Sequence, residues 1–271
     1  MITRHSNILP GGARRICVGL VLGAIGVTSI TGLSGTTQAS VETKPPNRGL
    51  ALKRKGPATR AMVIAAQQRL AELGYWIGEA DGKWGSASRD ALIAFQKVEG
   101  RTRSGKLTSS EIQALNDATP PSPLERGSAH IEVDLKRQVL FVVDADGTVS
   151  RILPVSTGSG RMFTTENYTQ PAVTPTGRFH VYRKVDGWRE SALGLLYYPN
   201  YIVGGIAIHG NPAVPVEPAS HGCVRIPMFA AEPLSEMMPI GTEVIVHDGG
   251  EITFSASRSA RQHQTETWNH R

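Results

Sequence analysis

The residues best suited to covalent chemistry lie together in one short stretch. Cys223 follows Ser220, His221 and Gly222, and Arg225 comes two residues after it. A cysteine attacks carbonyl groups as its thiolate, and a nearby histidine supports that state. Gly222 gives the backbone freedom to turn tightly, and successive amide groups in such a turn can stabilise an oxyanion. The stretch therefore predicts acyl transfer through one reactive thiol.

Two histidines are candidates for the base that activates this thiol. His209 ends an apolar run and precedes Gly210, so we expect it at the end of a rigid strand. His221 is close to the cysteine in sequence, but it could instead turn inward and hold the loop. We therefore favour His209 as the general base. In an extended segment Arg225 shares a face with Cys223, where it could bind a substrate carboxylate.

Two other interpretations of the same residues compete with catalysis. His209, His221 and Cys223 are all zinc-ligand types, but no fourth Cys or His follows at the spacing of a zinc finger. Cys223 could also be an inert core cysteine, although its Ser, His, Gly and Arg neighbours suit a core poorly. The sequence favours a nucleophile, and we expect no metal and no cofactor.

The first 39 residues have the pattern of a secretory signal. Arg14-Arg15 precede an apolar stretch over residues 16–30, and Thr37-Gln38-Ala39 supplies small residues for cleavage. An uncleaved membrane anchor is the alternative. We expect residues 1–39 to be a signal peptide, the mature chain to work in the periplasm or cell envelope, and no stable membrane span to remain after cleavage.

The cysteine count supports a functional thiol. The chain has two cysteines, and Cys17 lies inside the expected signal, so the mature chain would keep Cys223 alone. An exported chain with one cysteine forms no internal disulfide, and its thiol is either reactive or pairs between chains. The sequence leaves the oligomeric state open.

Composition and charge exclude several other classes of protein. Hydrophobic residues make up 40% of the chain and charged residues 19%, which allows a sizeable core. The formal net charge of +6 is not gathered into a long basic run. No phosphate-binding glycine loop and no basic-aromatic motif is present. We therefore expect no nucleic-acid partner.

Periodicity predicts a helical module after a linker at residues 40–57. Apolar residues at helical spacing predict three helices within residues 58–117, at 61–73, 86–98 and 108–115. Gly74 is a plausible C-terminal cap for the first helix, and Thr108 with Glu111 fits a capping box for the third. Prolines and a glycine at residues 118–128 predict an interdomain linker.

From residue 129 the apolar period changes to two, which predicts strands. They are expected at residues 131–135, 139–143, 149–155, 177–181, 205–209 and 243–247. Asp146-Gly147 indicates a hairpin turn, and residues 228–238 a short helix. The expected fold is multidomain, a small three-helix all-α module followed by a mainly-β, sandwich-like domain at residues 129–248. Residues 249–271 are polar, and we expect them to be disordered.

With these blocks in order, the chain resembles the L,D-transpeptidase family, also called the YkuD domain. The resemblance covers about residues 129–248 and is carried by Val155-Ser156-Thr157-Gly158, Thr174-Pro175-Thr176-Gly177-Arg178-Phe179 and Ser220-His221-Gly222-Cys223-Val224-Arg225. It implies a β-sandwich-like fold and a cysteine acyl-enzyme. The stretch from His209 to Ser220 is shorter than in many members and contains Pro212, Pro215 and Pro218, which we interpret as the compact loop of a subgroup.

The resemblance also implies a role for each site residue. Cys223 is the nucleophile, and His209 is the general base whose tautomer the Gly210 carbonyl holds. The backbone amides of His221, Gly222 and Cys223 line the oxyanion hole beside Ser220, and Arg225 contacts the substrate. Aromatic residues that could form a water-excluding lid, or could equally belong to the core, are Phe163, Tyr168, Trp188, Tyr197 and Tyr198.

Residues 58–117 resemble the peptidoglycan-binding type 1 domain. The matching motifs are Gln68-Arg69-Leu70, Leu73-Gly74-Tyr75, Asp81-Gly82, Trp84-Gly85 and Ala94-Phe95-Gln96. Together the two resemblances imply a carbapenem-sensitive enzyme that acts on peptidoglycan stem peptides and glycan. It would form a thioester from a tetrapeptide stem and transfer it to an amine, which gives a 3→3 cross-link. Water or a lipoprotein amine as acceptor, and a non-catalytic wall-binding protein, are the alternatives.

Overall fold

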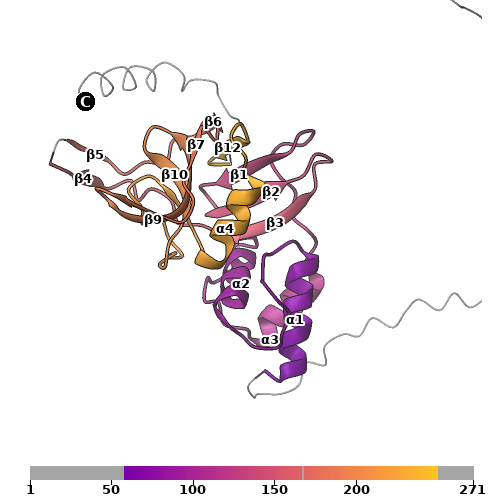
Figure 1. The fold of residues 1–271 in the computed structure, drawn as a ribbon. Helices are drawn as coiled ribbons and strands as arrows, with labels where there is room; N and C mark the ends of the chain where they lie inside the picture. Colours follow the sequence, from indigo (N-terminus) through magenta and orange to yellow (C-terminus); the bar gives the residue numbers. More distant parts are fainter. Residues whose placement is uncertain (1–57, 167, 250–271) are drawn as a thin grey trace, which may run out of the picture. The chain divides into compact units, whose positions relative to one another are not determined.

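The computed structural model describes residues 58–166 and 168–249, which lie within one compact unit of the chain (Figure 1). The expected signal peptide, the first linker and most of the C-terminal tail lie outside the described residues. In the described part of the chain, no helix has both the length and the apolar character needed to cross a membrane.

The three predicted helices are confirmed as α1 (Arg60–Glu72), α2 (Ser86–Val98) and α3 (Ser109–Asp117). Gly74 has a left-handed φ of 91°, and the Tyr75 amide donates to the Leu70 carbonyl at 2.9 Å, which closes the C-terminal end of α1. Thr108 Oγ1 caps α3 by accepting the Glu111 amide at 3.3 Å. The Glu111 carboxylate instead pairs with Arg101 at 3.1 Å, so half of the predicted capping box forms.

The first sheet has the strand order β3-β2-β1-β12-β6. Its members are β1 (His130–Asp134), β2 (Val139–Val143), β3 (Val149–Pro154), β6 (Gly177–His180) and β12 (Glu243–His247). Strands β1 and β12, far apart in sequence, pair in parallel, and the other neighbours are antiparallel. The predicted turn at Gly147 joins β2 to β3 with a left-handed φ of 79°.

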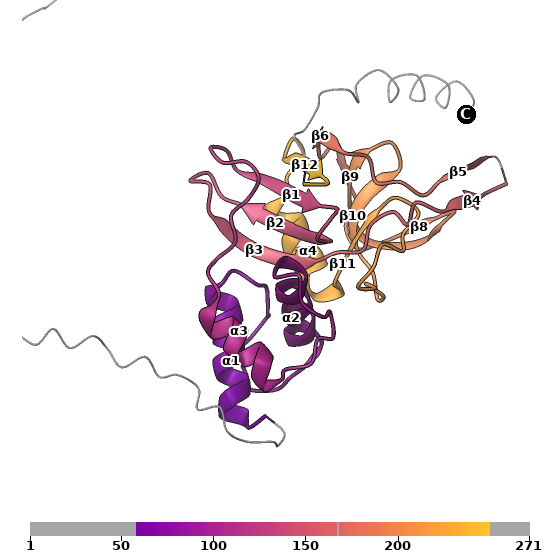
Figure 2. The ribbon, with the colours of Figure 1, turned by 180° about the vertical axis from the view of Figure 1, so that it is seen from behind.

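The second sheet carries the candidate site. Its order is β11-β10-β9-β7, with β8 also paired to β9. Its members are β7 (Arg183–Lys184), β8 (Trp188–Ser191), β9 (Gly194–Val203), β10 (Ile206–Gly210) and β11 (Val224–Ile226). A separate hairpin is formed by β4 (Met162–Thr164) and β5 (Thr169–Pro171). Figure 2 shows this hairpin extending from the same side of the β domain as β8.

The main core lies between the two sheets and α4 (Met228–Met237). Val133 and Leu140 enter it from the first sheet, Ile208 and Val224 from the second, and Leu234 from the helix, and all are fully buried. This confirms the predicted fold class, a helical module followed by a mainly-β, sandwich-like domain.

The opposite face of the first sheet is covered as well. Phe141 and Ile152 pack with Leu70 and Phe95 of the helices in a second apolar cluster. Strands β1 and β2 are consequently buried along both faces. Glu132, a polar position between the apolar residues of β1, is fully buried and accepts the Leu124 amide at 2.8 Å. The helices and the proline-rich segment thus enclose this sheet.

Candidate active site

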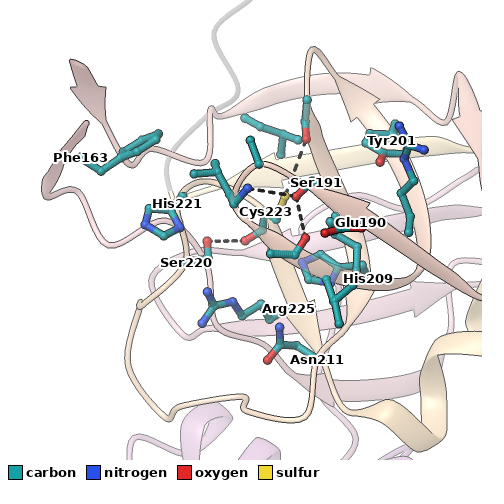
Figure 3. Close-up of a pocket in the computed structure, with 18 of the residues that line it drawn as sticks. Phe163, Glu190, Ser191, Tyr201, His209, Asn211, Ser220, His221, Cys223 and Arg225 are labelled. Carbon is teal, nitrogen blue, oxygen red and sulfur yellow. Dashed lines mark hydrogen bonds between the residues drawn. The ribbon is translucent and has the colours of Figure 1, made fainter. Parts of the chain in front are cut away.

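A pocket of about 490 Å³ is lined by five of the predicted site residues, whereas Gly210 and Gly222 do not line it (Figure 3). His209 and Arg225 line it from the second sheet, together with Ser220, His221 and Cys223 from the loop before β11. The β4–β5 hairpin contributes one wall and the β8–β9 hairpin the other. Residues that are 14 positions apart in the chain meet here because β10 and β11 run parallel side by side.

Cys223 is partly buried at the point where the loop enters β11. Its Sγ accepts the Ala207 amide at 3.5 Å and lies 3.8 Å from the Gly205 carbonyl oxygen. Burial raises the pKa of the Cys223 thiol, and the Ala207 amide and the Arg225 guanidinium offset this only in part. The thiol is therefore protonated at rest.

His209 is buried in β10, with 4% of its surface exposed. Its Nδ1–H donates to the Gly210 carbonyl at 2.9 Å, since a carbonyl can only accept. That bond leaves Nε2 with a free lone pair, the form that a general base requires. Burial lowers the pKa of His209 to about 4. The sequence suggested a thiolate held by histidine, whereas the structure favours a neutral thiol beside a neutral imidazole.

The loop before Cys223 is closed by Ser220. Its Oγ donates to the Cys223 carbonyl at 2.6 Å and accepts the Gly222 amide at 3.0 Å. Thr174 Oγ1 donates to the Gly222 carbonyl at 2.6 Å. Gly222 has a φ of 136°, and an added Cβ would lie 3.0 Å from the Val173 carbonyl oxygen, so this turn requires glycine.

The three sequence blocks meet around this loop. The Gly158 amide donates to Thr174 Oγ1 at 2.9 Å, and Gly158 also bridges to Ser220. Ser156 and Arg225 exchange backbone hydrogen bonds at 3.0 and 3.1 Å. The blocks, distant in sequence, therefore form the scaffold of the Cys223 loop.

His221 stands on the rim of the pocket and does not turn inward. It is exposed, and its ring lies 4.8 Å from that of Phe163 on β4. Tyr168 stacks edge-on against Phe163 at 6.1 Å, and both aromatic residues line the pocket. The other three candidate lid residues lie elsewhere: Trp188 packs on Tyr197, and Tyr198 donates to Glu232.

Several pocket residues were not predicted from the sequence. They are Arg183, Arg189, Glu190, Tyr201 and Asn211. Arg183 lies over the Tyr201 ring at 4.0 Å. Most belong to β7 and β8, which are short and largely exposed, or to β9, where no strand was predicted. Across residues 58–166 and 168–249, no three His, Cys, Asp or Glu side chains come together as ligands for a metal ion.

The chain was compared with known protein families. Residues 128–246 match the L,D-transpeptidase catalytic domain, YkuD, and residues 59–115 match a peptidoglycan binding domain. The crystal structure of an L,D-transpeptidase from Xylanimonas cellulosilytica shares 39% sequence identity, with a TM-score of 0.68, over 72% of this chain and 100% of that one. This chain belongs to the L,D-transpeptidase family and has a peptidoglycan-binding helical module before its catalytic domain.

More distant structures share lower identity. An L,D-transpeptidase from Stackebrandtia nassauensis is 24% identical over 70% of this chain and 91% of its own, with a TM-score of 0.41. One from Mycobacterium smegmatis is 22% identical over 44% of this chain and 58% of its own, with a TM-score of 0.36. A comparison with curated protein sequences found no match.

Proposed function

We propose that this protein is a peptidoglycan L,D-transpeptidase that cross-links stem peptides through a Cys223 thioester. The observation that supports the proposal best is the meeting of the Cys223 thiol and the buried, neutral His209 in one pocket. The family membership and the helical module support peptidoglycan as the substrate. The chain would act outside the cytoplasm, at the cell wall.

The first half-reaction forms the acyl-enzyme. His209 Nε2 takes the proton from Cys223 Sγ as the sulfur bonds to the carbonyl carbon of the L,D-peptide bond in a tetrapeptide stem. The carbon–nitrogen bond to the terminal D-alanine then breaks, and His209 returns the proton to the leaving amine. Starting from a neutral pair, the imidazolium appears only while the oxyanion exists, so each charge stabilises the other.

The oxyanion would be held by backbone amides of the Cys223 loop. The Gly222 amide already donates to Ser220 Oγ in this state. We therefore assign the main role to the Cys223 amide, with His221 beside it, and a positioning role to Ser220 and Gly222. Arg225 would bind a substrate carboxylate from its place in the pocket.

The second half-reaction transfers the acyl group. The side-chain amine of a diamino acid on another stem attacks the thioester, His209 accepts a proton from that amine, and the proton returns to Sγ as the carbon–sulfur bond breaks. Phe163 and Tyr168 on the pocket wall would shield the thioester from water. This apolar wall is why we favour an amine acceptor over hydrolysis.

Incubation with a defined disaccharide-tetrapeptide tests the proposal. We expect mass spectrometry to find an acyl adduct on the Cys223 peptide, free D-alanine and a cross-linked dimer, and a carbapenem to acylate the same residue. Cys223→Ala should abolish all four products. Cross-linking by the purified Cys223→Ala protein would contradict the mechanism, and the absence of any adduct on the wild-type thiol would favour a wall-binding protein without catalysis.

A further inference from the structure

Lys97 is a buried amine on α2 of the helical module. Only 2% of its surface is exposed, and its Nζ donates to the Val155 carbonyl at 2.8 Å and the Gln138 carbonyl at 3.0 Å. Burial lowers the pKa of Lys97 to about 7, and the amine keeps at least two N–H donors in either protonation state. Burying a lysine is costly unless it is hydrogen-bonded, and here its partners lie in the β domain.

Gln138 links Lys97 to Thr157. Its backbone has a left-handed φ of 60°, which is unusual for a residue other than glycine. Its side-chain amide holds Thr157 at two points: Nε2 donates to Thr157 Oγ1 at 2.6 Å, and Oε1 accepts the Thr157 amide at 3.0 Å. Both residues are 2% exposed, so water does not compete for these bonds.

Thr157 in turn holds the loop of the proposed nucleophile. Its carbonyl accepts the Ala219 amide at 3.0 Å and the Ser220 amide at 2.9 Å. Ser220 Oγ donates to the carbonyl of Cys223. A continuous chain of buried and partly buried hydrogen bonds therefore runs from Lys97 of the helical module to the backbone of Cys223.

A second contact reaches the same loop from its outer side. Arg103, after α2, pairs with Glu217 at 2.9 Å and donates to the Val216 carbonyl at 3.2 Å. Glu217 is 68% exposed, so this pair contributes little by itself. The helical module therefore contacts the loop directly through Arg103 and indirectly through the buried hydrogen bonds of Lys97.

We propose that Lys97 is a positioning residue for Cys223, so that the peptidoglycan-binding module completes the active site as well as holding the wall. By fixing the Gln138 and Val155 carbonyls, Lys97 sets the backbone that clamps Thr157 and hence the turn that presents the sulfur to His209. Loss of the amine loosens this turn, and small misplacements of reacting groups are costly to rate. The inference rests on the proposed nucleophile.

Lys97→Met tests the proposal, because methionine keeps much of the length and removes the donors. In the full chain we expect iodoacetamide to alkylate Cys223 about 10-fold more slowly, with a matching loss in kcat and little change in KM. Mass spectrometry of the Cys223 peptide separates this signal from Cys17. The control is Ile112→Ala on α3, which removes buried packing in the same module but removes no hydrogen-bond donor to either carbonyl. An equal loss in the control, measured on folded protein, would overturn the proposal.

A double-mutant cycle tests the route. Thr157→Val removes the Oγ1 contact with Gln138, leaves Lys97 fully bonded and remains informative if Lys97→Met folds poorly. We expect it to slow alkylation, and the double variant Lys97→Met/Thr157→Val to be no slower than the slower single variant. Unchanged alkylation in Thr157→Val, or losses that multiply, would overturn the route. Alkylation needs no peptidoglycan, so it can be measured even if the wild-type protein forms no cross-links. In that case the proposed function would be wrong, while slower alkylation of Lys97→Met would still support the positioning role.

Discussion

His209 on β10 and Arg225 on β11 are register partners in a parallel strand pair. The Arg225 guanidinium lowers the pKa of the His209 imidazole, which adds to the larger effect of burial. It also lowers the pKa of the Cys223 thiol, which opposes the larger effect of burial. One cation therefore adds to the effect of burial in keeping the base unprotonated, and it favours the thiolate as it forms. The same cation faces the pocket that would receive substrate.

Replacing Arg225 should change both binding and pH dependence. We expect Arg225→Met to raise KM about 10-fold through loss of a charge-assisted contact with a substrate carboxylate. The acid limb of kcat/KM should also move to higher pH, because the positive charge that opposes protonation of His209 is gone. Steady-state kinetics across pH check both effects. Arg189→Met, a pocket residue on β8, is the control, and an equal shift of the acid limb there would contradict the assignment.

The wild-type pH profile should have an unusually low acid limb. Burial lowers the pKa of His209 to about 4, so the neutral base persists well below the ordinary histidine range and is lost as pH falls through that value. Activity per folded molecule should therefore fall by half near pH 4. Initial rates, corrected by circular dichroism for folded protein, measure this. A midpoint near 6.5 would show that His209 titrates as an exposed imidazole.

Thr174 should be important for the Cys223 loop without contacting substrate. Thr174→Val keeps the side-chain shape but removes the donor to Gly222 and the acceptor for Gly158. Leaving buried partners unsatisfied costs roughly 1–3 kcal/mol, so we expect a loss of unfolding free energy in that range. Urea titration measures it. The exposed Thr102 provides a matched control, for which Thr102→Val should be nearly neutral.

The aromatic residues at the rim of the pocket should influence whether an amine or water accepts the acyl group. Phe163→Ala removes the ring that packs on His221 and opens the pocket wall. We expect the ratio of cross-linked dimer to hydrolysed tripeptide product to fall several-fold, because water reaches the thioester more easily. Trp188→Ala removes a more exposed aromatic residue that packs on Tyr197 and does not line the pocket, and its product ratio should stay unchanged. Product quantification by mass spectrometry compares the two variants.

Local patterns predicted the elements that carry strong apolar periodicity. The three helices, the hairpin at Gly147 and the strands of the first sheet formed as expected, since their side chains repeat at the period of the structure. Strands β4, β5, β7 and β8 were not predicted, because they are short and largely exposed. They build two walls of the pocket, so its shape could not be derived from the sequence.

The site was also predicted only in part from the sequence. Cys223, His209 and Arg225 were identified from residue type and order, and they do gather in one pocket. The protonation states of Cys223 and His209 could not be inferred, because they depend on burial by the β4–β5 and β8–β9 hairpins and by the sheets. Lys97 and Gln138 gave no signal either, since their significance comes from contacts with distant residues, 41 and 58 positions away for Lys97 and 19 positions away for Gln138.

The junction at the end of α1 has a practical consequence. Trp76 donates to the Ile152 carbonyl at 3.0 Å, and the Ile152 amide donates to Gly74 at 2.8 Å, so the module seals the outer edge of β3. Cutting the chain at the proline-rich segment would uncover that edge together with the apolar face around Phe141. Unsealed strand edges recruit other chains. The excised β domain should therefore self-associate, and expression trials would do better to keep both halves together.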